Sequence, residues 1–312
     1  MKNRKVCLVG CGSVGMAFIY GAINQGLFDE YILIDYNQDI AKGNAIDCLD
    51  SIAFLDRQPK IIKNGNYNDC SDADIVVITA GIAQQPHESR IDLVNKNAKI
   101  IKEIALKIKD SGFMGITIIA SNPVDIITNI YQKVTNYNPH KIIGTGTSLD
   151  SGRLVKIIAN QLNVSPKNIS AYVVGEHGDT SISLFSLATI GGVLLTDYSD
   201  LFNDEKKADI HNQMVQTAYE IIKLKKATYY GIGAAINKIC KAILYDQDLI
   251  LSISCISKYS QNIYLGWPVF INKNGWHDPI DLKLSQYELE KFNYSCNQMN
   301  NILKLVCNEL GI

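Results

Sequence analysis

The chain has 312 residues, of which 47% are hydrophobic and 20% charged, and its formal net charge at pH 7 is -1. This composition is that of an ordinary globular protein with room for one large domain or two modest ones. The near-neutral charge argues against general nucleic-acid binding, which requires a basic face, and no uninterrupted apolar segment is long enough to span a bilayer.

The beginning of the chain has one feature of a signal peptide but not the others. The basic start at Met1–Lys5 is followed by an apolar run that stops at Gly10 and Gly12. We therefore expect a strand and a glycine turn here, and a cytoplasmic protein. The eight cysteines include no C-x-x-C pair. They predict reduced thiols, with neither a disulfide framework nor a metal site.

The first segment predicts a dinucleotide-binding unit. Lys5–Val9 has the pattern of a buried strand, Gly10–Gly15 is a G-x-G-x-x-G turn that opens a helix, and a second strand over 31–34 ends at Asp35. The first glycine makes the turn, the second lets a pyrophosphate approach the backbone, and the third lets the helix pack on the strand. The N–H groups of the helix N-terminus then face the phosphates. Asp35 would bind the ribose hydroxyls and repel a 2′-phosphate, which favours NAD over NADP.

The alternation of strands and helices continues through the first half. A strand over 74–78 ends in Thr79-Ala80-Gly81, and a loop over 82–89 leads to a long helix that begins at Arg90. The apolar positions of this helix are Val94, Ala98, Ile101, Ile104 and Ile108. Further strands are expected over 116–119 and 141–143, separated by the turn Ala120–Pro123 and a helix.

This alternation predicts a parallel, doubly wound sheet of the Rossmann type, in an α/β domain. Ligands of such sheets lie at the carboxyl ends of the strands. The glycine turn, Asp35, Gly81 and Asn122 all fall at such ends.

The second half has a different pattern. A helix starts around 149–153, short strands surround His177, amphipathic helices cover about 204–223 and 228–245, strands cover 249–256 and 267–272, and a last helix covers about 285–309. We predict an NAD-binding domain over residues 1–144 and an α+β domain over residues 145–312 that packs tightly on it.

Three polar side chains of the second half are candidates for chemistry. His177 lies between two glycines at the end of a strand, and the charge change of histidine near neutral pH suits acid–base work. A lone histidine here is more often a residue of a surface turn. Asp150 and Arg153 are three residues apart and share a helix face, although an isolated pair of this kind is more often a surface ion pair. Asn122, before Pro123, is also a common turn residue.

Taken together, these segments resemble the L-lactate dehydrogenase family, which shares its fold with the malate dehydrogenases. The resemblance covers nearly the whole chain, through Val9–Gly15, Ile75–Arg90, Ser121–Asp125, Gly144–Arg153, Gly175–Thr180 and Ala227–Gly233. It implies that NAD is bound by Gly10, Gly12, Ser13, Val14, Gly15, Asp35, Thr79, Ala80, Gly81 and Asn122.

The resemblance also implies a catalytic mechanism. Asp150 would hydrogen-bond His177, and the protonated ring would give its proton to the keto oxygen of pyruvate as hydride arrives from NADH; in the reverse direction the neutral ring would be the base. Arg153 would hold the substrate carboxylate through two parallel hydrogen bonds. Arg90, on a loop expected to close over the substrate, would stabilise charge on the carbonyl oxygen. Asn122 would orient that oxygen, and Thr228 would line the pocket.

By the family pattern, Gln84 distinguishes lactate from malate enzymes. An arginine there would pair with the second carboxylate of oxaloacetate, whereas a neutral glutamine fits the methyl group of pyruvate. We therefore expect an L-lactate dehydrogenase of glycolysis and fermentation. The alternatives are a dehydrogenase for a bulkier 2-hydroxy acid such as hydroxyisocaproate, a malate dehydrogenase, and a non-catalytic NAD-binding sensor, which would leave Asp150, Arg153, His177 and Arg90 without a role.

The chain departs from the family pattern at several positions. His87 and Lys226 replace residues that are usually glycine in relatives, and Gly152 replaces a small residue that is commonly alanine. Val155 and Ser170 occupy the positions where bacterial relatives activated by fructose 1,6-bisphosphate have arginine and histidine, so we expect no such activation. Members of the family assemble through helix faces, and the expected state is a homotetramer, with a dimer as the alternative.

Overall fold

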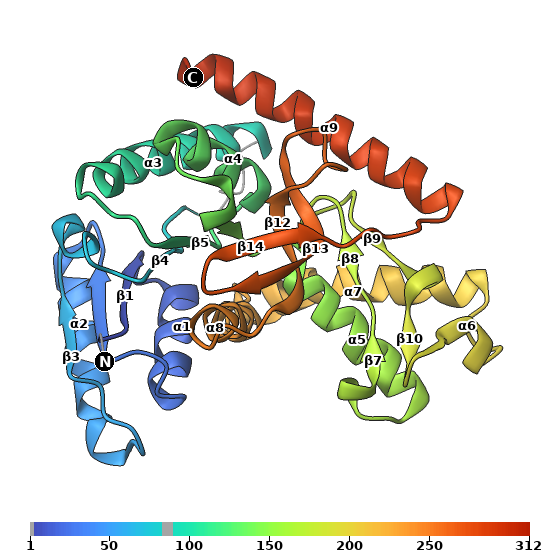
Figure 1. Ribbon diagram of the computed structural model, residues 1–312, viewed down its shortest axis with the longest axis horizontal. Coiled ribbons are helices and arrows are strands. Elements are labelled where there is room, and N and C mark those ends of the chain that lie inside the picture. Colours follow the sequence, from blue (N-terminus) through green and yellow to red (C-terminus); the bar gives the residue numbers. More distant parts are fainter. Residues whose placement is uncertain (1–2, 83–89) are drawn as a thin grey trace.

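The structure is a computed structural model that describes residues 3–82 and 90–312 (Figure 1). The predicted alternation of strands and helices in the first half is confirmed. The elements of this half are β1 (Lys5–Val9), α1 (Ser13–Asn24), β2 (Glu30–Ile34), α2 (Gln38–Asp50), β3 (Ile61–Asn64), β4 (Ile75–Ile78), α3 (Arg90–Asp110), β5 (Ile116–Ile119), α4 (Val124–Thr135) and β6 (Ile142–Gly144).

The second half has the helices and strands that its pattern predicts, within a few residues. They are α5 (Ser148–Leu162), the short strands β8 (Val173–Val174) and β9 (Ile182–Ser183) on either side of His177, α7 (Asp204–Lys225), α8 (Tyr230–Leu244), β12 (Leu249–Ile256), β13 (Tyr264–Asn272) and α9 (Gln286–Leu310). It also has short elements that were not predicted, namely β7 (Ile169–Ser170), β10 (Thr189–Ile190), β11 (Val193–Leu194), α6 (Leu195–Tyr198) and β14 (Gly275–Pro279). The strand expected from residue 267 begins three residues earlier, at Tyr264.

Two elements of the first half, α2 and β3, were not predicted. In α2 the buried side chains are Ala41, Ala45 and Cys48, while the larger Ile40 and Ile46 are exposed, so the helical period is hidden in the sequence. In β3 only Ile62 is buried. A strand with one buried residue has no alternation that a pattern can reveal.

Within the described residues, the main sheet has nine strands in the order β14-β13-β12-β6-β5-β4-β1-β2-β3. The strands from β6 to β3 in this order are parallel, as predicted. Strands β12, β13 and β14 extend this sheet in antiparallel fashion, and β12 pairs with β6 through Ser254 and Gly144. Strands from both halves therefore form one sheet, while the boundary between residues 144 and 145 stays a prediction.

Helices cover both faces of the sheet (Figure 1). Helices α1 and α8 pack together, and α3, α4 and α9 pack together. Strands β1, β4 and β5 are buried along their whole length, as is typical of parallel strands covered on both faces. All five predicted inward positions of α3 are buried, namely Val94, Ala98, Ile101, Ile104 and Ile108.

A second apolar cluster lies outside the main sheet. It joins α5 and α7 through Leu154, Ile158, Ile210 and Met214, and it also includes residues of β7 and β10. This cluster fixes α7 beside α5, and these two helices carry seven of the fifteen residues that line the cavity described below.

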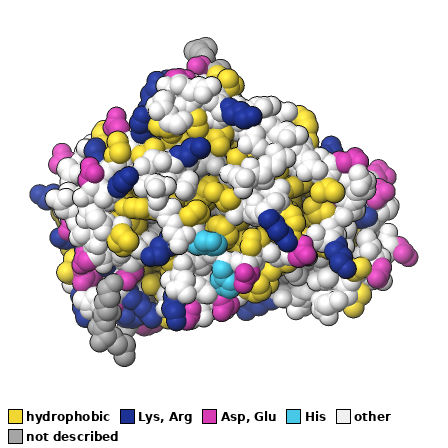
Figure 2. Space-filling model, turned by 45° about the horizontal axis from the view of Figure 1, so that its top comes forward, with side chains coloured by type: hydrophobic (Ala, Val, Ile, Leu, Met, Phe, Trp, Pro, Cys, Tyr) yellow, Lys and Arg dark blue, Asp and Glu magenta, His cyan; other side chains and the backbone are white. Residues whose placement is uncertain are grey.

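The surface carries charges of both signs. Figure 2 shows basic and acidic side chains interspersed over the visible face, with hydrophobic side chains reaching the surface between them. No helix in the described part of the chain is long and apolar enough to cross a membrane. All eight cysteines are buried and free. Over residues 3–82 and 90–312, no group of three or more His, Cys, Asp or Glu is placed to hold a metal ion.

Candidate active site

The glycine turn after β1 has the geometry that the sequence predicts. Gly10 has φ +102°, and a Cβ there would lie 2.5 Å from the backbone nitrogen of Ala80. A Cβ on Gly15 would lie 2.2 Å from the carbonyl oxygen of Gly10, so α1 can pack this close to β1 only through a glycine. A Cβ on Gly12, by contrast, would meet no heavy atom within 4 Å. The turn is thus open in front of the N-terminus of α1, where backbone N–H groups without helical partners can bind phosphate.

Asp35, at the end of β2, lies beside this turn. Its carboxylate accepts hydrogen bonds from the backbone N–H of Cys11 at 2.8 Å and of Asn37 at 2.9 Å. These bonds fix the carboxylate next to the glycine turn and leave lone pairs for a ribose.

The end of β4 completes this edge of the sheet. The hydroxyl of Thr79 donates to the carbonyl of Gly10 at 2.7 Å, and the backbone N–H groups of Thr79 and Ala80 both donate to Val9. Ser13 and Val14 lie in the first turn of α1, and Gly81 follows β4. The structure therefore brings these predicted residues to the carboxyl ends of adjacent strands, and they fit a dinucleotide: an open turn for the pyrophosphate and a carboxylate for the ribose.

The turn that carries His177 is held by elements distant in the sequence. Gly175 exchanges two backbone hydrogen bonds of 2.9 Å with Gly266 of β13. The N–H of Glu176 donates to the hydroxyl of Ser295 in α9 at 2.9 Å. The N–H of His177 donates to the carboxylate of Asp125 in α4 at 2.8 Å. Three consecutive peptide N–H groups are thus bound by three different elements, and the histidine has a fixed position.

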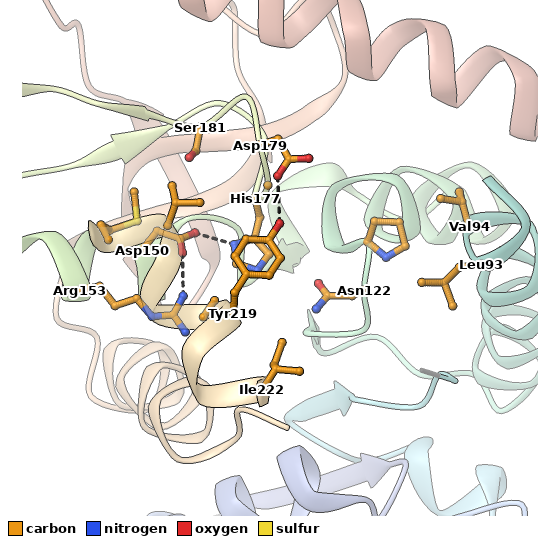
Figure 3. A pocket seen from close by; sticks show the side chains of 15 residues that line it. Leu93, Val94, Asn122, Asp150, Arg153, His177, Asp179, Ser181, Tyr219 and Ile222 are labelled. Carbon is orange, nitrogen blue, oxygen red and sulfur yellow. Dashed lines mark hydrogen bonds and ion pairs between the residues drawn. The ribbon is translucent and has the colours of Figure 1, made fainter. Parts of the chain in front are cut away.

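The structure brings together His177, Asp150 and Arg153 (Figure 3). Nδ1 of His177 lies 2.6 Å from Oδ2 of Asp150, and Nη1 of Arg153 donates to Oδ1 of the same carboxylate at 3.2 Å. The side chains of Asp150 and Arg153 are 9% and 8% exposed, which excludes a surface ion pair, while that of His177 is 28% exposed.

Burial and charge act in opposite directions on this pair. Burial alone would raise the pKa of Asp150, but the charge of His177, its hydrogen bond and Arg153 hold this pKa below the ordinary value. Burial alone would lower the pKa of His177, but the charge of Asp150, its hydrogen bond and the charge of Asp125 raise it, against a smaller opposing effect of Arg153. The environment therefore favours an ionised carboxylate beside a protonated imidazole.

These side chains open onto a cavity of about 320 Å³. Its polar wall includes Asn122, Asp150, Arg153 and His177. Its apolar wall comes largely from α7, with Met214, Val215, Ala218 and Ile222, and from α3, with Leu93 and Val94. The hydroxyl of Tyr219 donates to Asp179 at 3.1 Å, which links α7 to the histidine turn (Figure 3). An anionic molecule with a small apolar part fits a wall of this composition.

The backbone of Asn122 is hydrogen-bonded by a residue that the sequence did not indicate. The buried side chain of Asn97, on α3, donates to the carbonyl of Asn122 at 2.8 Å. It also exchanges hydrogen bonds with both backbone groups of Ile82. Asn97 therefore fixes the ends of the segments that follow β4 and β5, and only the three-dimensional arrangement identifies it.

Four predicted positions are placed less directly. Gln84 and His87 lie outside the described residues. Arg90 begins α3, but its side chain is not described either. Thr228 is half-buried between α7 and α8 and is not among the residues that line the cavity. The roles predicted for these residues stay predictions. Lys226, which directly follows α7, has φ +72°, the left-handed conformation in which glycine is favoured.

Comparison with known proteins agrees with this geometry. Residues 4–144 match the family model of the lactate/malate dehydrogenase NAD-binding domain, and residues 147–310 match that of its α/β C-terminal domain. The chain belongs to the lactate/malate dehydrogenase family. It is accordingly an NAD-dependent oxidoreductase, and the resemblance noted in the sequence is confirmed.

Individual members of the family resemble the chain over its whole length. The L-lactate dehydrogenase of Malacoplasma penetrans is 49% identical and aligns with 100% of this chain and 99% of its own, and that of Lactococcus lactis is 42% identical over 97% and 98%. The crystal structure of a lactate dehydrogenase from a Medee basin deep-sea metagenome has a TM-score of 0.94 at 39% identity and covers 100% of both chains. The ligand-bound minor L-lactate dehydrogenase of Enterococcus mundtii also has a TM-score of 0.94, at 38% identity over 97% of this chain and 98% of its own.

Proposed function

We propose that the chain is an NAD-dependent L-lactate dehydrogenase, which transfers hydride reversibly between NADH and pyruvate with His177 as acid and base. The observation that carries this proposal is the cluster of His177 with the buried Asp150 and Arg153 on a cavity beside Asn122. Relatives that align with nearly the whole chain at 42–49% identity are named L-lactate dehydrogenases, which supports lactate over the other 2-hydroxy acids of the family.

In this mechanism each polar residue has one task. Since Nδ1 of His177 bonds to Asp150, Nε2 is the nitrogen left to exchange a proton with the substrate oxygen. Asp150 fixes the tautomer and stabilises the positive ring. Arg153 binds the substrate carboxylate, for which its planar two-pronged donor is suited. Bound NADH supplies the hydride. Asn122 and Arg90 are proposed to act on the substrate carbonyl, as the family pattern implies.

The test is NADH oxidation, followed by absorbance, with pyruvate, 4-methyl-2-oxopentanoate and oxaloacetate as substrates. We expect the highest kcat/KM with pyruvate. A preference for the branched acid would favour the hydroxyisocaproate alternative, and a preference for oxaloacetate would favour a malate dehydrogenase. If NADH binds but none of the three acids is reduced, the chain is a non-catalytic NAD-binding protein.

Discrimination against oxaloacetate is proposed to depend on Gln84. An arginine there would form a charge-assisted pair with the second carboxylate of oxaloacetate, worth about 1.5–3 kcal/mol. Facing the methyl group of pyruvate, the same guanidinium would lose hydration without gaining a partner. Gln84→Arg should therefore raise kcat/KM for oxaloacetate and lower it for pyruvate, and Gln85→Arg is the adjacent control. An unchanged ratio of the two constants would remove Gln84 from substrate selection.

We also propose a homotetramer, with a dimer as the alternative, that works in the cytoplasm. Exposed apolar side chains on helices, such as Ile40 and Ile46 of α2 and Leu224 of α7, are suitable for contacts between subunits. Sedimentation equilibrium would give the mass of the assembly, for which the chain mass is 34.6 kDa.

A further inference from the structure

Asp125, in the first turn of α4, is a buried acid that the proposed mechanism does not use. It is 1% exposed, and each of its carboxylate oxygens accepts one hydrogen bond. Oδ2 accepts from the backbone N–H of His177 at 2.8 Å, and Oδ1 accepts from the hydroxyl of Ser254 in β12 at 2.5 Å. A neutral side chain would suffice to fill this space, so the presence of an acid requires a reason, because burying a charge is costly.

The charged groups around His177 indicate that reason. The charges that act on the ring are those of the carboxylates of Asp150 and Asp125 and of the guanidinium of Arg153, and the charges that act on Asp125 are those of His177 and Glu176. Asp150 already shares its charge between His177 and Arg153. Asp125 therefore adds a second negative charge near the ring. Arg153 bonds to Asp150 and not to Asp125.

The position of Asp125 also determines where the ring lies. Its bond is to the peptide of the histidine itself, and its second oxygen is held by β12, a strand of the main sheet. The histidine backbone is in this way attached to the sheet through one side chain. Burial raises the pKa of Asp125 to about 6, against the opposing effect of the hydrogen bonds from Ser254 and His177, so the carboxylate is ionised at neutral pH.

We propose that Asp125 is a second positioning carboxylate for His177, which holds the peptide of the histidine and favours a positive charge on its ring. This inference rests on the proposed acid–base role of His177. Asp125 is not among the residues that line the cavity, so it would act on the reaction through the histidine.

The test is Asp125→Asn, which removes the charge and keeps the shape. The amide oxygen can still accept from His177, and the amide N–H₂ can face Ser254. The matched control is Thr128→Val, one turn further along α4, where a fully buried hydroxyl donates only to the carbonyl of Val124. Both variants disturb the interior of one helix, but only the first changes the charge beside His177.

The measurement is kcat/KM against pH in both directions, because this constant reports the ionisation of the enzyme before the substrate binds. Pyruvate reduction requires the protonated ring and lactate oxidation the neutral ring. Loss of the charge in Asp125→Asn should lower the pKa of the His177 ring. The alkaline limb of the kcat/KM profile for reduction and the acid limb of the profile for oxidation should therefore both move to lower pH. Reduction then falls several-fold at pH 8, while oxidation near pH 6.5 is maintained or rises. Below about pH 6, where Asp125 itself is protonated, the variant and wild type should converge. Thr128→Val should leave both limbs in place.

A purely structural role for Asp125 predicts a different result. Both directions would then fall by the same factor at every pH with their limbs unmoved, and this outcome would overturn the proposal. If Asp125→Asn does not fold, Ser254→Ala replaces it: loss of the hydroxyl keeps Asp125 protonated to higher pH, so the limbs should move the same way by a smaller amount. Unmoved limbs in Ser254→Ala would equally overturn the proposal.

A titration of the His177 ring by NMR separates this inference from the proposed function. The signal is assigned among five histidines by its absence in His177→Asn. A lower ring pKa in Asp125→Asn supports the inference even if wild type fails to reduce pyruvate, in which case the proposed function alone is wrong. An unchanged ring pKa with an active wild type refutes the inference alone.

Discussion

Replacing Gly12 and Gly15 by alanine, one at a time, should separate cofactor binding from folding. A Cβ on Gly12 would have no heavy atom within 4 Å, and the φ of -76° and ψ of -174° at this residue suit alanine. The methyl group would instead enter the space where we place the pyrophosphate of NAD. Gly12→Ala should therefore leave the free energy of unfolding of the cofactor-free protein within about 0.5 kcal/mol of wild type.

The same substitution at Gly15 should destabilise the protein itself. Its Cβ would lie 2.2 Å from the carbonyl oxygen of Gly10, 2.7 Å from Oγ1 of Thr79 and 2.9 Å from Cδ2 of Leu8. The first of these atoms belongs to the backbone, so α1 would have to move away from β1. Overpacking of this kind costs about 1–3 kcal/mol.

Thermal and denaturant unfolding with and without NADH measures both effects. A ligand at 100 times its Kd stabilises a protein by about 2.7 kcal/mol. Loss of charge-assisted hydrogen bonds worth about 1.5–3 kcal/mol would weaken binding about 10- to 150-fold. For a hundredfold loss, the stabilisation by the same NADH concentration falls to about 0.4 kcal/mol. If NADH stabilises Gly12→Ala as much as wild type, the cofactor does not lie against this turn, and the reasoning from the open space is wrong.

Further substitutions test other parts of the molecule. His177→Asn should lower kcat for pyruvate by about 10²–10⁴-fold while NADH binding survives, and near wild-type turnover would remove His177 from the mechanism. Asp35→Ser should relax the preference for NADH towards NADPH; equal use of both by wild type would contradict the proposed role of Asp35. Gly152→Ala, at an exposed helical position with no heavy atom near a Cβ, should raise the free energy of unfolding by about 0.5–1 kcal/mol. Lys226→Gly should also raise the free energy of unfolding, by about 1 kcal/mol, because φ is +72° at this residue. Denaturant unfolding measures both effects, and an unchanged or lower free energy of unfolding in either variant would refute the estimate for it.

The dinucleotide turn could be predicted because its determinants are local. The strand, the three glycines and Asp35 lie within one short segment, and each glycine has its own steric reason at its own position. The inward face of α3 could be predicted for a similar reason, since a large apolar side chain recurs at helical spacing. In both cases the physical cause acts between residues that are close in the sequence.

The support of the histidine turn could not be predicted in this way. Asp125 and Ser295 bind successive peptide groups of this turn from 52 and 119 residues away. No local pattern marks either residue, because a buried acid in a first helical turn and a serine in a last helix have many other uses. Their role follows only from the position of α4 and α9 on the same side of the sheet.

Burial decides how the pair of Asp150 and Arg153 should be interpreted. On an exposed helix, two such charges three residues apart stabilise little, and the sequence alone favours that reading. Here α5 lies between the main sheet and α7, so both side chains are less than 10% exposed, and the carboxylate has cationic partners on both of its oxygens. Removing one partner from a buried set of this kind leaves the others without compensation. The arrangement therefore favours an ionised Asp150 beside a protonated His177 at the wall of the cavity, which is the state that the proposed acid–base role requires.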